Sequence, residues 1–394
     1  MILPALLFGV PLVTAVILLC NKNTAVRNGL VKGSAALMMV LAIAIGVMYF
    51  GHPQKIGLSG EWVKLVMFGV DVLAVAAVCY YSFKFKRHSI ALLGLLQFGI
   101  ISAFEYHMGS RIYTSWDFII DNFAIIMILI AGIIGSLISV YSLGYMAVHH
   151  RKHPAEADRR PFFFFIVFLF LAAMFGLVMS NNLLYMYTFW EITSLCSFLL
   201  IGYTRTNDAI HNSCKALWMN LLGGLAFALA IVYMGEMYYT VELSQLINLG
   251  RSHQPVELAV ALLVFCGFTK SAMMPFSGWL LGAMVAPTPT SALLHSSTMV
   301  KAGVFLIIKL APLLGNNHAG VMAMLIGGAT FFFASCAAIS QSDGKKVLAY
   351  STISNLGLIV CCAGTGSYEA AWTAIMIVIF HAVAKSLLFL TVGT

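Results

Sequence analysis

The sequence predicts an all-α polytopic membrane protein with about 13 transmembrane helices. Of its 394 residues, 61% are hydrophobic and only 9% are charged. A soluble domain of this size could not bury so much apolar surface, whereas a helix that spans a bilayer needs about 20 apolar residues. The apolar runs are continuous rather than alternating, which favours helices over the strands of a membrane barrel.

The apolar runs fill the chain from end to end, and no large soluble domain separates them. The predicted spans are 4–20, 33–50, 66–82, 89–104, 121–145, 161–179, 182–203, 212–234, 257–282, 288–310, 319–340, 346–363 and 369–391. The longer connections are 106–120 and 236–256. Within the first, residues 110–119 alternate enough to predict a short hairpin.

The basic residues of the connecting loops test this set of spans, because each span moves the next loop to the other side of the membrane. One set of alternate loops holds fourteen basic residues, namely Lys22, Arg27, Lys32, Lys84, Lys86, Arg87, Arg151, Lys152, Arg159, Arg160, Arg205, Lys215, Lys345 and Lys346. The other set holds only Lys55, Lys64, Arg111 and Arg251. The imbalance predicts a multi-pass protein of the cell inner membrane, with the N-terminus outside and the basic loops in the cytoplasm.

Several function classes are disfavoured by what the sequence contains. The net charge of +8 lies in short loops without interleaved aromatic residues, so no nucleic-acid partner is expected. The eight cysteines form no CxxC pair and lie mostly in apolar runs, where helix packing is their simplest role. No P-loop, GxGxxG motif or nucleophile–base set stands out. We therefore expect neither a catalytic residue nor a bound cofactor or metal in this chain.

Lys270 is the clearest candidate for chemistry, because it lies deep in an apolar span. It stands about 13 residues into its span, hence about 20 Å along the helix. Charge at that depth is costly and usually marks a function. Pro275 follows five residues later and removes a backbone donor, which predicts a broken helix near Lys270. The alternative is a structural lysine bonded to the carbonyls that the break frees.

Glu191 is the one acid that the sequence places deep in an apolar span. A lone buried carboxyl tends to stay neutral, but a lysine partner could ionise it. Lys270 is the obvious partner. The alternative is a carboxyl that simply bonds neighbouring helices.

Four further residues could extend a titratable series, namely His295, Lys301, His381 and Lys385. His381 and Lys385 are four residues apart and share a helix face. His295 and Lys301 are six apart and do not. Lys309 is near a predicted helix end, where it can reach the interface, and we interpret it as an anchor. Such a series, connected by water, suits proton conduction better than substrate hydrolysis.

Four stretches of this sequence resemble one known family. They are 181–203, 268–303, 345–357 and 381–393, and the resemblance covers about residues 115–394. The chain is similar to the large antiporter-like subunits of respiratory complex I, of membrane-bound NiFe hydrogenases and of multisubunit cation/proton antiporters. The resemblance implies that Glu191 pairs with Lys270 and that His295 and Lys301 pass protons along the membrane plane. His381 and Lys385 would then extend the polar axis.

The chain also departs from the pattern of that family. Members of the family usually continue with further spans, including a second broken helix. We therefore predict only a partial inverted repeat in this chain. Either the sequence is truncated, or a partner supplies the remaining spans. Some relatives carry an acid early in the span after the glutamate helix, where this chain has Gly224, and some carry a second histidine where it has Ile377. We predict membrane helices in 1–114, with a two-helix insertion, and an antiporter-like core, incomplete at its C-terminus, in 115–394.

The predicted function is ion translocation, of protons or possibly sodium, within a complex I-like redox-driven pump, either an energy-converting membrane-bound hydrogenase or an NADH-quinone oxidoreductase. The resemblance implies partners that include other membrane subunits, the lipid bilayer and a soluble redox arm. Iron–sulfur clusters and NiFe or flavin would be held by those partner subunits. The alternative is a component of a multisubunit monovalent cation/proton antiporter.

Overall fold

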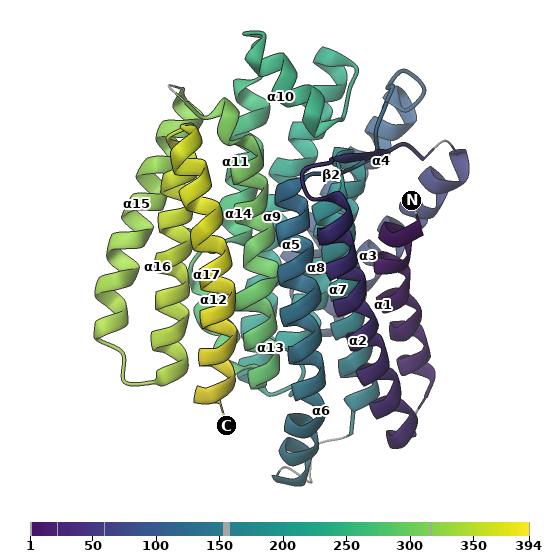
Figure 1. The fold of residues 1–394 in the computed structure, drawn as a ribbon, viewed down its shortest axis with the longest axis vertical. Coiled ribbons are helices and arrows are strands. Elements are labelled where there is room, and N and C mark those ends of the chain that lie inside the picture. The colour runs from purple at the N-terminus through teal and green to yellow at the C-terminus, as the bar shows by residue number, and fades with distance from the viewer. Residues whose placement is uncertain (1, 22, 59, 153–157, 316, 394) are drawn as a thin grey trace.

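The computed structural model describes residues 2–21, 23–58, 60–152, 158–315 and 317–393. Lys22, one of the basic residues counted above, lies outside these ranges. Helices run roughly side by side through the whole molecule (Figure 1). Within the described residues the strands amount to one short two-stranded sheet. The all-α membrane fold that the composition predicts is confirmed.

Twelve helices of the described chain are long and apolar enough to cross a membrane. They are α1 (Ile2–Cys20), α2 (Thr24–Tyr49), α3 (Glu61–Lys84), α4 (His88–Met108), α5 (Asn122–Leu129) with η1 (Ile130–Ile134) and α6 (Gly135–Lys152), α7 (Arg160–Met179), α8 (Leu183–Ile201), α9 (Asn207–Tyr238), α13 (Thr288–Ala292) with η3 (Leu293–Ser297), α14 (Met299–Leu310) and η4 (Ala311–Leu313), α15 (His318–Ile339), α16 (Gly344–Gly364) and α17 (Tyr368–Val392). The π-helical turns η1 and η3 interrupt two of these spans without ending them.

The remaining predicted span, 257–282, which is the ninth along the chain, is an interrupted helix. Its parts are α11 (Glu257–Lys270) and α12 (Gly278–Gly282), followed by η2 (Ala283–Val285). The break falls where Pro275 predicts it, because proline has no N–H to continue the helical ladder. The short helix α10 (Leu243–Arg251) lies at the end of the bundle that is drawn at the top of Figure 1.

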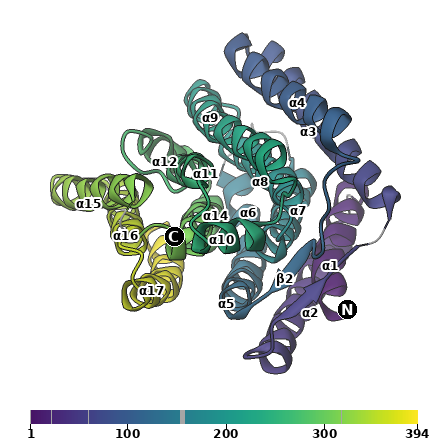
Figure 2. The same ribbon diagram turned by 90° about the horizontal axis from the view of Figure 1, so that it is seen from above.

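Burial varies along the bundle as expected for helices that meet either protein or lipid. Every residue in the apolar window of the α13–α14 span is buried, whereas only 11% of the corresponding α3 window is. Figure 2 shows α15, α16 and α17 at one end of the layout and α1 to α4 at the opposite side, with α11 and α14 between them. Helices α11 and α14, which carry Lys270 and Lys301, are therefore interior, and the exposed apolar faces of the outer helices suit contact with lipid.

The short hairpin predicted within residues 110–119 is wrong. Residues Phe118–Ile120 form strand β2, but its antiparallel partner is β1 (Gln54–Ile56), with Gln54 opposite Ile120. The two loops meet because α2 ends and α5 begins at the same end of the bundle. Alternation along the chain can indicate a strand, but it carries no information about which strand pairs with it.

A buried polar cluster at that end fixes where α8 begins. Asn182 caps α8 by accepting a hydrogen bond from the Leu184 amide at 3.0 Å, and its side-chain amide donates to Asp117 at 2.9 Å. The Asn181 amide donates to Glu242, which also accepts from the backbone of the β2 loop. These contacts join α8, α10 and the β2 loop, and so set the depth of Glu191 in the bundle.

Candidate functional site

Lys270 is the last residue of α11 and is completely buried. Its ammonium donates to the Trp190 backbone carbonyl at 2.7 Å and to the Ser194 hydroxyl at 2.9 Å, both on α8. It also lies 4.4 Å from the centre of the Trp190 ring. Two oxygens and an aromatic face therefore hold a charged group in the interior, where an unsolvated ammonium would otherwise be costly.

Glu191 lies beside Lys270 but does not form an ion pair with it. The two are close enough for their charges to interact. Successive residues of a helix point about 100° apart, so the lysine that faces Trp190 and Ser194 is offset from the Glu191 carboxyl. The Oε1 atom of Glu191 is inaccessible and accepts no hydrogen bond from the described residues. The predicted neighbours are thus adjacent without a direct contact.

The break after Lys270 is stabilised by neighbouring helices. The Trp279 indole on α12 donates to the Thr269 carbonyl at 2.9 Å, and the Met274 amide donates to Thr330 of α15 at 3.1 Å. Ala272 has a left-handed φ of 56°, so the chain turns sharply there. Polar backbone at this depth is tolerated because these partners satisfy it.

The other four predicted residues lie close to one another at the junction of η3, α14, α16 and α17. Lys301 donates to the Val378 carbonyl at 3.1 Å, and Lys385 donates to Ser351 at 2.7 Å. His381 interacts electrostatically with Lys301, Lys385 and His295. His295, which is completely buried, and His381, which is 5% exposed, leave both ring nitrogens without a partner among the described residues. Unpaired imidazole nitrogens in the interior are candidates for relaying protons through water.

Trp279 lies between the two groups of titratable residues. Its indole N–H bonds the residue before Lys270, and its ring lies 6.3 Å from the ring of His295. Sequence reasoning missed this role, because a lone tryptophan in an apolar run is ordinary. One side chain therefore contacts both the broken helix and the π-helical turn that carries His295.

A small cavity is lined by Glu191 but not by Lys270. Its volume is about 30 Å³, and α3, α4, α8 and α9 line it. Asp71, Gln97 and Tyr187 contribute its other polar side chains. Sequence reasoning missed Asp71, although a single acid in an otherwise apolar span was a signal of the same kind as Glu191.

Gly224 of α9 leaves room for this arrangement. A Cβ at this position would collide with Oε1 of Glu191 and with the side-chain oxygen of Gln97. A side chain at the position where some relatives carry an acid would therefore have to displace the ends of Gln97 and Glu191.

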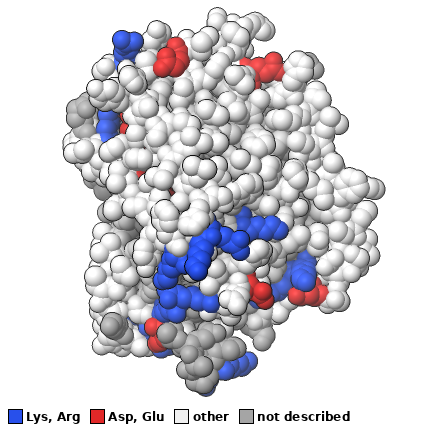
Figure 3. Space-filling view, turned by 180° about the vertical axis from the view of Figure 1, so that it is seen from behind, with Lys and Arg blue, Asp and Glu red and all other residues white. Residues whose placement is uncertain are grey.

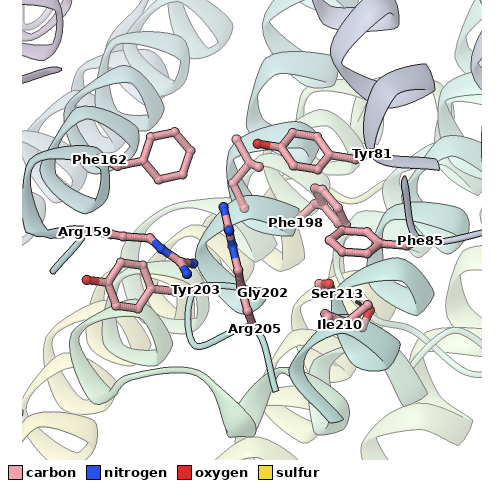
Figure 4. Close-up of a pocket in the computed structure, with 11 residues that line it drawn as sticks. Tyr81, Phe85, Arg159, Phe162, Phe198, Gly202, Tyr203, Arg205, Ile210 and Ser213 are labelled. Carbon is pink, nitrogen blue, oxygen red and sulfur yellow. Dashed lines mark hydrogen bonds between the residues drawn. The ribbon is translucent and has the colours of Figure 1, made fainter. Parts of the chain in front are cut away.

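A second pocket of about 30 Å³ lies at the basic end of α8 and shares no lining residue with the buried series. Arg159 and Arg205 extend toward it among Tyr81, Phe198 and other aromatic side chains (Figure 4). Seen from behind, the visible lysines and arginines gather mostly in the lower half of the molecule (Figure 3). The charge asymmetry read from the loops is therefore a property of one end of the bundle.

Lys309 forms contacts with other side chains of the protein. It forms an ion pair with Asp121, the N-cap residue of α5, and lies 5.4 Å from the centre of the Phe305 ring. It also borders an open hollow of about 760 Å³ between α5, α10 and α17. Among the residues that the structure describes, no three His, Cys, Asp or Glu side chains gather as a metal site would require.

Comparison with known proteins shows which family the chain belongs to. Residues 180–394 match the family described as NADH:quinone oxidoreductase/Mrp antiporter, transmembrane. The chain belongs to this family. Residues 107–156 match the N-terminal model of chain 5 of NADH-ubiquinone oxidoreductase, complex I. The antiporter-like family that the sequence motifs predict is thus confirmed.

Individual members of the antiporter-like family show how far the likeness extends. The chain is 32% identical over 91% of its length to the A1 subunit of a Na(+)/H(+) antiporter from Staphylococcus haemolyticus, covering 44% of that protein. It is 36% identical over 81% of its length to the A/B subunit of a probable K(+)/H(+) antiporter from Rhizobium meliloti, covering 31%. It therefore spans less than half the length of these curated relatives.

Two solved structures share the fold. The Mrp complex from Dietzia sp. DQ12-45-1b has a TM-score of 0.76 at 27% identity, covering 100% of this chain and 37% of that one. An archaeal respiratory membrane complex, the membrane-bound sulfane sulfur reductase, has a TM-score of 0.77 at 19% identity, covering 99% and 70%. At that lower identity the likeness concerns the fold alone.

Proposed function

We propose that this chain is the ion-translocating part of a multisubunit monovalent cation/proton antiporter in the cell inner membrane. The observation that carries the proposal is the likeness to two antiporter subunits, over 91% and 81% of this chain. That likeness favours the alternative named from the sequence over the redox-driven pump. The N-terminus would lie outside and the basic loops in the cytoplasm, as the loop charges predict.

The proposed path begins at the Glu191–Lys270 pair. Lys270 can release a proton only if its ammonium can be neutralised, which desolvation and a neighbouring carboxyl can control. The next groups are His295 and Lys301, followed by His381 and Lys385. Trp279 lies between the two groups, and water would fill the distances that the side chains do not span. Pro275 maintains the break that exposes polar backbone beside Lys270.

The redox-driven pump is the second candidate, and the fold shared with the respiratory complex favours it. In that case a soluble arm with iron–sulfur clusters and NiFe or flavin would supply the energy, whereas an antiporter uses an existing gradient. The N-terminal helices of 1–114, with α3 and α4 as the inserted pair, and the core of 115–394 would serve either machine.

Everted vesicles from cells that make the full-length protein with its native companions separate the two candidates. Addition of Na⁺ or K⁺ without an electron donor is expected to move protons. Glu191→Gln and Lys270→Ala should abolish that movement, whereas the exposed controls Glu236→Gln and Lys346→Ala should retain it. Proton movement that needs an electron donor would favour the pump, and full activity in both buried variants would reject ion translocation through this site.

A further inference from the structure

The helix pair α3–α4 turns an acid toward the interior although most of its surface suits lipid. On α3, Leu65 and Leu73 are each 71% exposed. Asp71 is half-buried on the opposite side and accepts a hydrogen bond from Thr188 of α8 at 3.0 Å. Asp71 stands about 15 Å along its membrane helix. A carboxyl at that depth is costly to bury and therefore usually marks a function. Thr188 stands one turn before Glu191, so Asp71 is bound to the same face of α8.

The cavity between these helices brings the two acids together. Asp71 and Glu191 both line it, and their charges interact. Its volume of about 30 Å³ is enough for one or two water molecules, since a single water needs about 10–15 Å³. An interior space with convergent oxygens of this kind holds water or a proton more readily than it stays dry.

The hydrogen bonds around the cavity leave one acceptor without a donor. Tyr187 donates its hydroxyl to Gln97 at 3.3 Å, and the Gln97 amide donates back to the Leu93 carbonyl of its own helix at 3.2 Å. Neither group serves Glu191, whose inaccessible Oε1 has no partner among the described residues. Leaving a buried acceptor unsatisfied costs about 1–3 kcal/mol. Protonation of the Glu191 carboxyl would lower that cost, because a neutral carboxyl is less costly to bury than a carboxylate.

A third acid extends the series toward the end of the bundle. Glu105 lies in the last turn of α4 and interacts electrostatically with Asp71 and with Lys64 near the start of α3. Glu105 and Lys64 are thus close to a helix end, Asp71 is deeper, and Glu191 adjoins Lys270. The three acids therefore lie at increasing depth, from the end of the α3–α4 pair toward the broken helix.

We propose that the cavity between Asp71 and Glu191 is a proton-binding site through which α3 and α4 load Glu191. The O–H bond of the Asp71 carboxyl breaks, a water in the cavity takes that proton and gives up another, and an O–H bond forms on the Glu191 carboxylate. Charge is conserved because one carboxylate replaces the other. Two carboxylates on one small cavity repel each other, which favours a single shared proton. The inference rests on the proposed function and adds the path by which protons reach Glu191.

The test measures proton movement in everted vesicles that contain the full-length protein with its companions. Asp71→Asn keeps the shape but cannot carry the proton, so the rate should fall about tenfold or more. Asp71→Glu should restore most of it, which a purely structural role for the Thr188 hydrogen bond would not predict. Asp208→Asn, on the exposed first turn of α9, is the matched control. Wild-type rates in Asp71→Asn, with Glu191→Gln inactive, would overturn this inference and leave the proposed function intact.

A second measurement does not depend on activity, and its first arm uses the wild-type protein alone. Dicyclohexylcarbodiimide modifies protonated carboxyls in apolar surroundings, and peptide mass spectrometry locates the product. We expect modification of the wild-type protein at Asp71 or Glu191, and a changed extent at Asp71 in Glu191→Gln because the two share one proton. Absence of modification at both residues, under conditions that label another membrane carboxyl protein, would contradict the shared proton.

Discussion

Lys270 donates its shortest hydrogen bond, 2.7 Å, to the backbone carbonyl of Trp190, the residue directly before Glu191. The ammonium is therefore held on the neighbouring face of α8, and its interaction with the Glu191 carboxyl acts through space. A contact ion pair would be hard to separate, whereas an offset pair lets each charge affect the other while both exchange protons. The geometry also suits a structural lysine, so variants must distinguish these roles.

Lys270→Arg distinguishes proton exchange from structural hydrogen bonding. A guanidinium can donate to the Trp190 carbonyl and to Ser194, but it does not release its proton in proteins. We expect assembly to persist and vesicle proton movement to fall about tenfold or more. Lys346→Arg, at an exposed position, is the control. Normal transport in Lys270→Arg would show that the lysine serves only as a donor.

Trp279→Phe tests the connection between the two titratable groups. The variant retains a ring near His295 but loses the indole N–H that satisfies the Thr269 carbonyl. Stability should decrease by about 1 kcal/mol, and transport should fall because the end of the broken helix loses a constraint. Thermal unfolding in detergent and vesicle assays measure the two effects. An unchanged melting temperature with unchanged transport would remove Trp279 from the site.

Gly303→Ala tests the close approach of α14 to the broken helix. A Cβ at this position would lie 2.6 Å from the Gly267 carbonyl oxygen and 2.8 Å from the Ser271 amide nitrogen. Both are backbone atoms, so the helices must separate, and we expect a loss of about 1–3 kcal/mol. Gly9→Ala on α1 has open space and should be neutral or stabilising by about 1 kcal/mol. Equal melting temperatures for the two variants would contradict the packing.

Lys309→Met tests the interpretation of this residue as an anchor. Its ion pair with Asp121 is partly exposed, with side chains 15% and 38% accessible. Pairs of this kind contribute about 0–1 kcal/mol, so stability should change little, and transport should stay within about twofold of wild type. Lys301→Met, completely buried, is the contrasting variant and should lose transport. Loss of transport in Lys309→Met would extend the ion path to the hollow beside α17.

The sequence predicts those residues of the candidate site whose type is unusual in an apolar span. Lys270, Glu191 and Pro275 are conspicuous because charge and proline are rare in apolar spans. The structure places Glu191 near Lys270 and the helix break directly after Lys270. Asp71 is equally conspicuous, but its span belongs to the predicted peripheral insertion. Its meaning depends on α3 packing against α8, which no pattern along the chain reveals.

The sequence by itself determined the class of the protein, the order of its spans and the position of the broken helix, because hydropathy, loop charge and proline act locally. The partial inverted repeat and the roles of the buried residues stay predictions. Only the tertiary structure decided which groups meet: Lys270 with the Trp190 carbonyl, Asp71 with Glu191 across a small cavity, Lys309 with Asp121, and β2 with β1. Partners far apart in the chain are chosen by how helices pack and by which buried polar atoms must be satisfied. That choice belongs to the whole fold rather than to any segment.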